Sequence, residues 1–482
     1  MEAVPAAPMK AVNFPATSAV PRATASATLA SAWPQNKLNM LTLYAPNPTT
    51  RFSLLSLTRC STKPNTDTNN ETDQNSTFEA NPNPDNENPT RHVSNEAVPS
   101  SSTPSSSLSR GLVLDLGTVD SWDCREIGSP VVKRFLSDEE ERWYMWYHGV
   151  SNGKPGSDSI GLAVSSNGVH WERGKGAVKS SADVGLVMNC GNDWWAFDTK
   201  SIMPGEVVIM SSAKVRASSA VYWLYYTGYS SEQVDILGNS SGFNVQNPER
   251  FCVDDSRSSG IGKIFRSLPG LAISQDGRHW ARIEGEHHSG ALFDVGSEGD
   301  WDSLFIAAPQ VVFHGYGDLR MYYHSFDVKN GEYCIGIARS RDGMKWIKLG
   351  KIMGGGKRSC FDELGATNPC VVKNKKDGEY IMAYEGVDAD GLRSIGLAVS
   401  PDGLKDWTRL RDEAVLKPGT DDGWDNEGIG SPCLVGMDGD VDEWRLYYRG
   451  IGNGGRSGIG MAVSDGSEIT RFRRWTGFQV PS

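Results

Sequence analysis

A unit of about 60–75 residues recurs five times between residues 115 and 476, and this repetition limits the possible folds more than any other feature of the sequence. Each copy begins with an aromatic–Asp pair, continues through a proline into an apolar segment, and then carries a Tyr-rich segment. A segment with Ala-x-Ser follows, then an Asn/Asp-Gly step and a stretch that contains an aromatic residue. The aromatic–Asp pairs begin at Trp122, Phe197, Trp301, Phe361 and Trp424. Since a unit of this length cannot bury its apolar faces alone, neighbouring copies are expected to pack against one another.

The segments within each copy predict antiparallel β-strands. Asn/Asp-Gly steps suit tight hairpin turns, in which the backbone needs positive φ. The Tyr-rich segments are apolar or aromatic at nearly every position, which is typical of a strand covered on both faces. Four antiparallel strands per unit, repeated around an axis, describe the blades of a propeller. The sequence therefore predicts an all-β, five-bladed β-propeller over residues 111–482, with a polar insertion at 231–269 forming a loop on one rim of the second blade.

The first 110 residues differ in composition from the repeats. Residues 1–60 contain one acidic residue, Glu2, among many Ala, Ser, Thr and Pro residues and five basic ones, without the apolar core of a secretory signal. This composition predicts a transit peptide of the plastid type and hence a location in the chloroplast stroma, the alternative being a disordered tail without targeting function. Residues 61–110 have too few apolar side chains to offset the entropy of ordering, and they predict a flexible linker.

Charge and cysteine content exclude several classes of function. The chain has 48 Lys and Arg against 59 Asp and Glu, a net charge of −11 with no basic run, which argues against nucleic-acid binding. It has no run of roughly 20 apolar residues, so we expect no membrane span. Seven of the eight cysteines lie in the repeat region with no CxxC pair, which favours a reducing compartment and no disulfide framework. The sequence predicts no metal site and no cofactor, since His148 and His324 have no third ligand pattern near them.

The order of motifs in each repeat resembles a known group of proteins. An aromatic–Asp pair, a proline seven or eight residues later, a Tyr–Tyr strand and the pattern IG-[LI]-A-x-S-x-DG-x-x-W are similar to those of the arabinanase, levansucrase and invertase superfamily of glycosidases (glycosyl hydrolase 43/32-like), in a plant plastid form. The resemblance implies a sugar in a central funnel and carboxylates on the innermost strands, one directly before the first repeat's proline and one two residues before a later proline. Here Ser129 precedes the first proline, while Ala307 and Gly430 stand two residues before later ones.

Residues that break the repeat are the candidates for a functional site. One variable place lies just before the proline strand, and a second follows the Tyr-rich strand. The candidate catalytic carboxylates at these places are Glu126, Glu385 and Glu427. The candidate substrate-binding residues are Arg125, His148, Lys200, His324 and Arg449. We expect these side chains to converge near the axis, either as an acid/base pair in a sugar site or as structural ion pairs that fill the channel.

Other repeated and inserted residues have competing interpretations. An Asp recurs at one equivalent place in all five copies, which predicts a structural cap that accepts backbone N–H bonds. These residues are Asp123, Asp198, Asp302, Asp362 and Asp425. The insertion carries aromatic and basic residues that would cap the funnel or dock a protein partner, or would belong to a loop with neither role. They are Phe243, Phe251, Phe265, Arg257, Lys263 and Arg266.

Two functions remain open at this stage. The first is carbohydrate binding or glycoside hydrolysis in the chloroplast, with an oligosaccharide or glycoside as ligand. The second is a catalytically inactive propeller that acts as a protein-binding scaffold or assembly factor, recruiting its partner through the 231–269 insertion.

Overall fold

The computed structural model describes residues 110–136, 141–152, 158–210, 221–236, 251–252, 262–420, 422–437 and 443–477. The predicted transit peptide, the predicted linker as far as residue 109, and much of the insertion lie outside the described residues. Within these ranges the chain forms β-strands and connecting turns, with one short 3-10 helix at Asn453–Gly455. The prediction of an all-β protein built from antiparallel sheets is confirmed. No helix among the described residues has the length and apolar character needed to span a membrane.

The first two repeats each form a sheet of antiparallel strands. The first sheet contains β2 (Glu126–Leu136), β3 (Glu141–Val150), β4 (Asp158–Ser165), β5 (Glu172–Arg173) and β6 (Gly185–Asn189), of which β5 and β6 both pair with β4. The second contains β7 (Ser201–Ile209), β8 (Tyr222–Ile236), β10 (Gly262–Ser274), β11 (Ala281–Ile283) and the short β9 (Phe251–Cys252), which pairs with β10. In both sheets the strand with the repeated proline is the first.

The last three repeats follow the same order. The third contributes β12 (Ala307–Gly315), β13 (Asp318–Asp327), β14 (Glu332–Ser340) and β15 (Trp346–Met353). The fourth contributes β16 (Gly365–Lys373), β17 (Tyr380–Val387), β18 (Arg393–Ser400) and β19 (Thr408–Arg409). The fifth contributes β20 (Gly428–Met437), β21 (Glu443–Gly452), β22 (Arg456–Asp465) and β23 (Glu468–Arg474). A single parallel residue pair, Tyr333 with Gly365, joins the third and fourth groups into one sheet.

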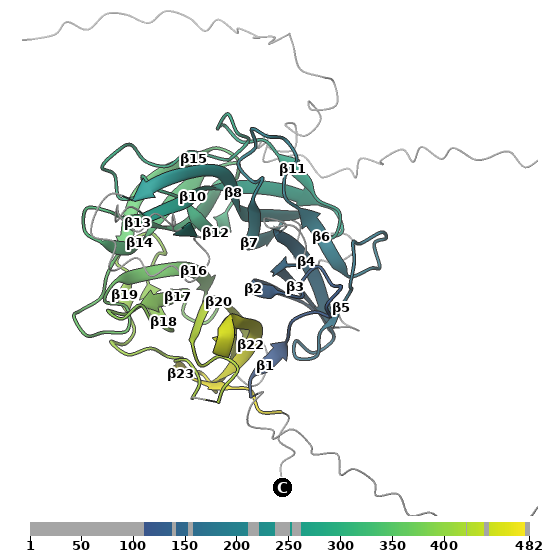
Figure 1. Cartoon of the computed structure of the whole chain (residues 1–482). Helices are drawn as coiled ribbons and strands as arrows, with labels where there is room; N and C mark the ends of the chain where they lie inside the picture. Colours follow the sequence, from purple (N-terminus) through teal and green to yellow (C-terminus); the bar gives the residue numbers. More distant parts are fainter. Residues whose placement is uncertain are drawn as a thin grey trace, which may run out of the picture. The chain divides into compact units, whose positions relative to one another are not determined.

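The first strand of every repeat faces the centre of a ring (Figure 1). Each inner strand contacts the inner strand of the next repeat, and the last contacts the first. The contacting pairs are β2 and β7, β7 and β12, β12 and β16, β16 and β20, and β20 and β2. The strand β1 (Leu112–Leu114), which precedes the first repeat, pairs antiparallel with β22 of the last repeat. The segment before the first repeat is therefore part of the last sheet, and the first and last repeats contact each other.

The apolar core lies between neighbouring sheets. Each main cluster of buried side chains draws on two consecutive repeats, and one cluster joins the first repeat to the last. Trp146 of β3, for example, lies 5.9 Å from Tyr222 of β8 between ring centroids, and its Nε1 donates a hydrogen bond to the Gly277 carbonyl at 2.8 Å. This packing explains why the Tyr-rich strands are apolar on both faces.

The ends of the 231–269 insertion extend two strands of the second sheet. β8 and β10 continue as an antiparallel ladder as far as the pair Ile236 with Gly262, so these ends are strand and the prediction of a loop is wrong there. Three polar residues of β8 in this part of the ladder, Ser231, Glu232 and Gln233, are exposed. Glu232 Oε1 accepts a hydrogen bond from Arg266 Nε at 3.0 Å. Phe265 and Arg266 are half-buried on β10, Phe251 and Lys263 lie on strands, and Phe243 and Arg257 lie outside the described residues.

The repeated Asp forms the same buried contacts in every copy, which we call the anchor. Each Asp is at most 3% exposed, and its carboxylate accepts a hydrogen bond from a Tyr hydroxyl of the second strand at 2.8–3.0 Å. The Tyr residues are Tyr147, Tyr226, Tyr323, Tyr384 and Tyr448. A base on the outer strand pairs with the same carboxylate at 2.5–3.0 Å. The bases are Arg173, Arg282, Lys348, Arg409 and Arg474. The role of the Asp is structural, but its partners are side chains rather than the backbone N–H groups expected from the sequence.

Candidate functional site

A cavity lies where the inner strands meet near their first residues. It is small, with a volume of about 40 Å³, and it is partly open to solvent. All five proline segments contribute to its wall. The lining residues are Ser129, Pro130, Val131, Met203, Pro204, Gly205, Thr227, Tyr229, Ala307, Ala308, Asn368, Pro369, Ser431 and Pro432. Among the residues that the structure describes, the wall is therefore made of hydroxyl, amide and apolar groups, and it carries no charged side chain.

The wall is shaped by a distortion in the inner strands. In four of them the residue directly before the proline has a left-handed backbone, with φ of 47° at Ser129, 51° at Ala308, 47° at Asn368 and 46° at Ser431. The pairing register with the second strand shifts across each of these residues, as in a β-bulge. Such a backbone costs about 1–3 kcal/mol in a non-glycine residue, so the surrounding contacts must hold it in place.

The variable place after the Tyr-rich strand supplies part of that support. Residues at this place pair with the inner strand just ahead of the bulge, as His148 does with Gly128 and Glu385 with Thr367. In three repeats the side chain also accepts a hydrogen bond from the backbone N–H of the next repeat's bulge residue. These pairs are Thr227 Oγ1 with Ala308 N at 2.8 Å, His324 Nδ1 with Asn368 N at 3.2 Å, and Glu385 Oε2 with Ser431 N at 2.8 Å. The place therefore links each of these repeats to the next one.

Glu385 is the most deeply buried of the predicted catalytic residues. Its side chain is 2% exposed, Oε1 pairs with Arg393, and Oε2 accepts from Asn368 Nδ2 at 2.7 Å as well as from Ser431 N. A Cβ on Gly430 would lie 2.0 Å from Oε2, so only glycine fits beside this carboxylate. Glu385 thus lies behind the cavity wall and orients two residues that line it.

Glu126 forms an ion pair with another predicted site residue. Its Oε1 lies 3.1 Å from Arg449 NH2, and both side chains are mostly buried, at 15% and 13% exposed. The Arg449 stem covers Gly128, where a Cβ would lie 2.5 Å from Cδ. This pair joins the first repeat to the last, which is the arrangement expected of the structural alternative.

His148 and His324 are both buried and lie in separate surroundings. His148 Nε2 lies 3.4 Å from Asp158 Oδ2, which also accepts a hydrogen bond from Ser201 Oγ at 2.5 Å. His324 stacks edge-on with Phe305 at 5.8 Å. The one group of metal-ligating side chains found in the described part of the chain contains neither histidine; it consists of Asp327, Glu332 and Cys334, and Lys351 Nζ pairs with both carboxylates at 3.2 and 3.0 Å.

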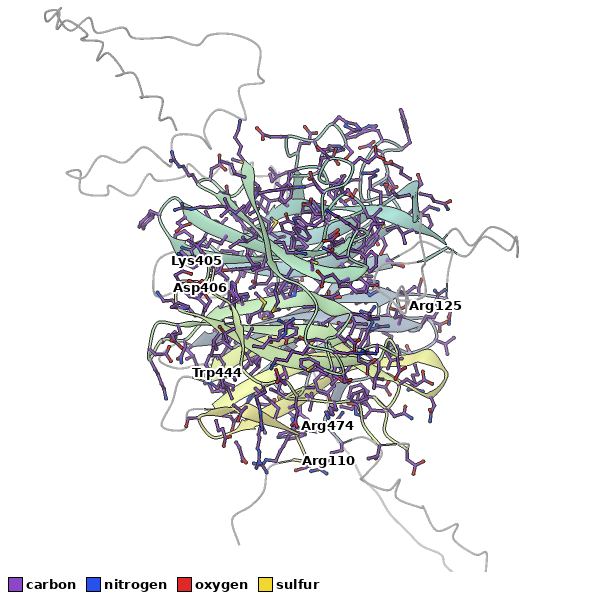
Figure 2. All side chains as sticks on the ribbon, turned by 90° about the vertical axis from the view of Figure 1, so that its left-hand side faces the viewer. Arg110, Arg125, Lys405, Asp406, Trp444 and Arg474 are labelled. Carbon is purple, nitrogen blue, oxygen red and sulfur yellow. The ribbon has the colours of Figure 1, made fainter. Side chains whose placement is uncertain are left out.

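The remaining three predicted residues are exposed. Glu427 Oε1 accepts a hydrogen bond from Gly454 N at 3.2 Å, and Arg125 and Lys200 lie at the surface before β2 and β7. Figure 2 views the ring from its side and places Arg125 on one face, opposite Lys405, Asp406 and Trp444. None of the eight predicted site residues lines the cavity, and the structure brings Glu126 and Arg449 into direct contact.

The partners of the predicted residues and the polar wall itself were not foreseen from the sequence. Asp158 and Arg393 each begin the third strand of a repeat and pair with His148 and Glu385 on the second. The sequence did contain a signal for these pairs. Asp158 is acidic where His148 is basic, and Arg393 is basic where Glu385 is acidic. Asn368 gave a weaker signal, since Asn directly before a repeated proline tolerates the left-handed backbone better than most residues do.

Comparison with known proteins bears on the fold. A structure described as a BT0996 RGII complex superposes with a TM-score of 0.50 at 15% identity, over 76% of this protein and 94% of that one. A structure described as a glycoside hydrolase gives 0.49 at 15% identity, over 77% and 95% of the two chains. A thermostable family-43 glycoside hydrolase gives 0.48 at 17% identity, over 72% and 92%. At 15% identity, the superposition on the first of these structures shows a shared β-propeller fold and nothing beyond the fold.

Comparison of sequences adds two relatives. The uncharacterized proteins MT1551 and Rv1502, from two strains of Mycobacterium tuberculosis, are each 32% identical over 208 residues, or 41% of this chain and 62% of theirs. The match thus spans less than two thirds of the length of these curated relatives. No family model matches the chain.

Proposed function

We propose that this protein is a five-bladed β-propeller of the chloroplast stroma that binds an oligosaccharide or glycoside at the open mouth of its axial cavity without hydrolysing it. The observation that carries the proposal is the cavity wall, which presents hydroxyl and amide groups among apolar ones, has no charged side chain among its described residues, and draws on all five inner strands. Small-molecule sites are typically apolar clefts with a few placed polar groups, and a neutral sugar matches hydroxyl and amide groups without a charged partner.

The count of five blades is supported by the ring of inner strands. Each repeat supplies one inner strand, and the five contact one another in a closed order. A second strand, a third strand and shorter outer strands follow in each repeat, which suits four antiparallel strands per blade.

Three wall residues are suited to recognise sugar hydroxyls. Ser129 and Ser431 place hydroxyl groups on the wall from the first and last repeats. Glu385 fixes the Asn368 amide by accepting from its Nδ2 at 2.7 Å, which leaves Oδ1 to accept a hydrogen bond from a ligand. The buried ion pair behind the wall therefore presents a fixed neutral acceptor rather than a carboxylate.

The contacts of the candidate carboxylates favour binding over hydrolysis. Glycoside cleavage uses two carboxyl groups about 5–9 Å apart, with one protonated and the scissile bond between them. Glu385 is held by Arg393 and Glu126 by Arg449, while Glu427 is exposed. None of the three lines the cavity in which the sugar would lie.

The proposed location in the plastid rests on residues 1–60, whose acid-poor, hydroxyl-rich composition is typical of a transit peptide. Imaging of residues 1–80 fused to a fluorescent reporter tests it, and cytosolic or secreted fluorescence would contradict it.

A protein-binding scaffold or assembly factor is the second candidate. It is supported by the same engaged carboxylates and by large exposed aromatic side chains, among them Trp194 at 90% and Tyr316 at 97% exposed. Exposed aromatics are enriched at interfaces between proteins.

Binding of arabino-, fructo-, galacto- and xylo-oligosaccharides to the purified protein tests the first proposal, by calorimetry and by an assay for released sugars. We expect at least one of them to bind and none to be cleaved. Asn368→Gly and Ser431→Gly should each weaken binding about tenfold, because one hydrogen bond of roughly 1–1.5 kcal/mol is lost. Glycine tolerates the positive φ at both positions.

Ser359→Gly is the matched control, since Ser359 has φ of 66° but is exposed and does not line the cavity. This variant should bind as the unchanged protein does. Release of sugar products would overturn the proposal in favour of hydrolysis. Failure of every oligosaccharide to bind, together with a stable protein partner in plastid extracts, would favour the scaffold.

A further inference from the structure

Directly after the cavity wall, the five inner strands each contribute one side chain to a second polar cluster on the axis. The members of this axial cluster are Lys133, Glu206, Gln310, Cys370 and Cys433. Lys133 Nζ lies 2.5 Å from Glu206 Oε1, and Gln310 Nε2 donates to Glu206 Oε2 at 2.8 Å. The cavity wall includes the residues immediately before both cysteines, Pro369 and Pro432. Neither the proposed function nor the anchors use these two thiols.

The two cysteines of the axial cluster occupy the same position in adjacent repeats. Both are 8% exposed, both are free thiols, and their strands β16 and β20 contact each other. Leu434 N donates a hydrogen bond to Cys370 Sγ at 3.3 Å, so this sulfur lies against the peptide that follows Cys433. The two thiols are close enough for each to shift the pKa of the other.

The surroundings make the two thiols chemically different. The hydrogen bond with Cys370 lowers the pKa of Cys433, and the Lys133 charge and the Val132 N–H, 3.3 Å from Cys433 Sγ, act in the same direction. The same thiol–thiol hydrogen bond, followed by burial, raises the pKa of Cys370 well above its usual value. One sulfur is thus suited to be a thiolate nucleophile, and its neighbour remains a protonated thiol able to resolve the product.

We propose that Cys370 and Cys433 are a peroxide-oxidisable dithiol that closes to a reversible disulfide between β16 and β20. Because both sulfurs are buried, only a small oxidant such as hydrogen peroxide can reach them. The Cys433 thiolate attacks one peroxide oxygen, the O–O bond breaks, and the released hydroxide takes up a proton to give water. Cys370 then loses its proton and attacks the Cys433 sulfenic acid, whose hydroxyl leaves as a second water. Two thiols and one peroxide give one disulfide and two waters.

Peptide mass mapping of the full chain tests this proposal without any sugar ligand. The reduced native protein is treated with graded hydrogen peroxide, then denatured in an excess of alkylating reagent, digested and mapped. We expect a cross-linked pair of peptides, one containing Cys370 and the other Cys433. Its mass should be the sum of the two reduced peptides minus two hydrogens, and dithiothreitol should separate the pair. Cys334, buried with its pKa raised to about 12 by burial and without a thiol partner among its described contacts, is the internal control and should remain fully alkylated.

Two outcomes would overturn the proposal. One is full alkylation of both Cys370 and Cys433 after peroxide treatment of the folded protein, and the other is a cross-link that forms only once circular dichroism reports unfolding. The variant Cys370→Ser supplies a separate readout, because Cys433 should then stop at the sulfenic acid, which dimedone labels. Loss of sugar binding in the earlier experiment would leave these results unaffected, so the two proposals fail independently.

Discussion

The anchors and the variable places near the axis are built from similar charged and polar side chains, yet they repeat differently. The anchor keeps an Asp, a Tyr and a base in all five copies, with the same contacts each time. The variable place holds five residues of different chemistry. Thr227, His324 and Glu385 nevertheless have the same role, since each accepts a hydrogen bond from the backbone N–H of the bulge residue in the next repeat. Variation at a repeated position is therefore weak evidence for a ligand site.

The difference follows from what each position must satisfy. A buried carboxylate between a Tyr hydroxyl and a base needs all three groups in one geometry, so any single change leaves a buried polar group without its partner. Burial raises the pKa of the anchor tyrosines, as for Tyr226 and Tyr448, with the neighbouring Asp adding to the effect, so the hydroxyl stays protonated as a donor. A backbone N–H, in contrast, can donate its hydrogen bond to any side chain that brings an oxygen or nitrogen lone pair to the right place.

The largest effect should come from breaking one anchor. Asp362 is fully buried and holds Tyr384 at 2.9 Å and Arg409 at 2.5 Å. Asp362→Ala should lower the free energy of unfolding by about 3–5 kcal/mol, because a mostly buried Arg loses its counter-charge. Denaturant unfolding followed by tryptophan fluorescence measures the loss.

The exposed ion pair of Asp412 with Lys357 provides the control for that variant. Its carboxylate lies 2.6 Å from Lys357 Nζ, but the side chains are 55% and 75% exposed. Asp412→Ala should leave the free energy of unfolding almost unchanged, because water already screens this pair. Equal losses in the two variants would mean that the anchor contributes no more than a surface pair does.

The fold could be predicted from the sequence because the five copies of the repeat can be aligned with one another, position by position. The strand order, the hairpin steps and the structural role of the repeated Asp all follow from comparing the five copies with one another. The basic partner of the anchor was missed although it stands two residues after an aromatic residue, as Arg173 does after Trp171 and Arg409 after Trp407. The base lies on the outer strand of each repeat, whereas the Asp precedes the first strand. The two are far apart in the sequence and meet only in the folded sheet.

The cavity wall was harder to predict for a different physical reason. Ser129, Asn368 and Ser431 face the axis because a bulge with positive φ changes the direction of the strand at that residue. The alternation of side chains along an undistorted strand does not foresee that change. The charged residues predicted instead are drawn away from the cavity by partners such as Arg393, whose contact depends on the paired strands.

An intermediate effect is expected at Glu126, where the structural and catalytic hypotheses differ. Glu126→Gln removes the charge that faces Arg449 while it keeps the shape of the side chain. Because the pair is only partly buried, the free energy of unfolding should fall by about 1–2 kcal/mol. Sugar binding should not change, since Glu126 does not line the cavity. Unchanged stability with loss of any sugar-dependent signal would instead support a catalytic role.

The smallest effect concerns His314, at the end of the axial strand β12 remote from the cavity residues. Its Nδ1 lies 2.7 Å from the Tyr380 hydroxyl and the two rings stack at 4.6 Å. Burial, with a contribution from the Arg320 charge, lowers the pKa of His314 from 6.5 to about 4. The unfolded chain therefore binds more protons than the folded one between these values, and the stability due to this group is lost as the pH falls from about 6.5 toward 4.

Replacement of this histidine isolates its share of the acid sensitivity. In His314→Asn the drop in melting temperature between about pH 7.5 and about pH 5 should be smaller than in the unchanged protein, since no imidazole remains to take up a proton on unfolding. His170→Asn is the control, because His170 is exposed and should leave the pH dependence as it was. Parallel curves for the unchanged protein and His314→Asn would show that the contact with Tyr380 does not hold His314 in its neutral form. A smaller drop would show that part of the sensitivity to acid depends on His314, a side chain of one repeat alone, whereas all five repeats build the cavity wall.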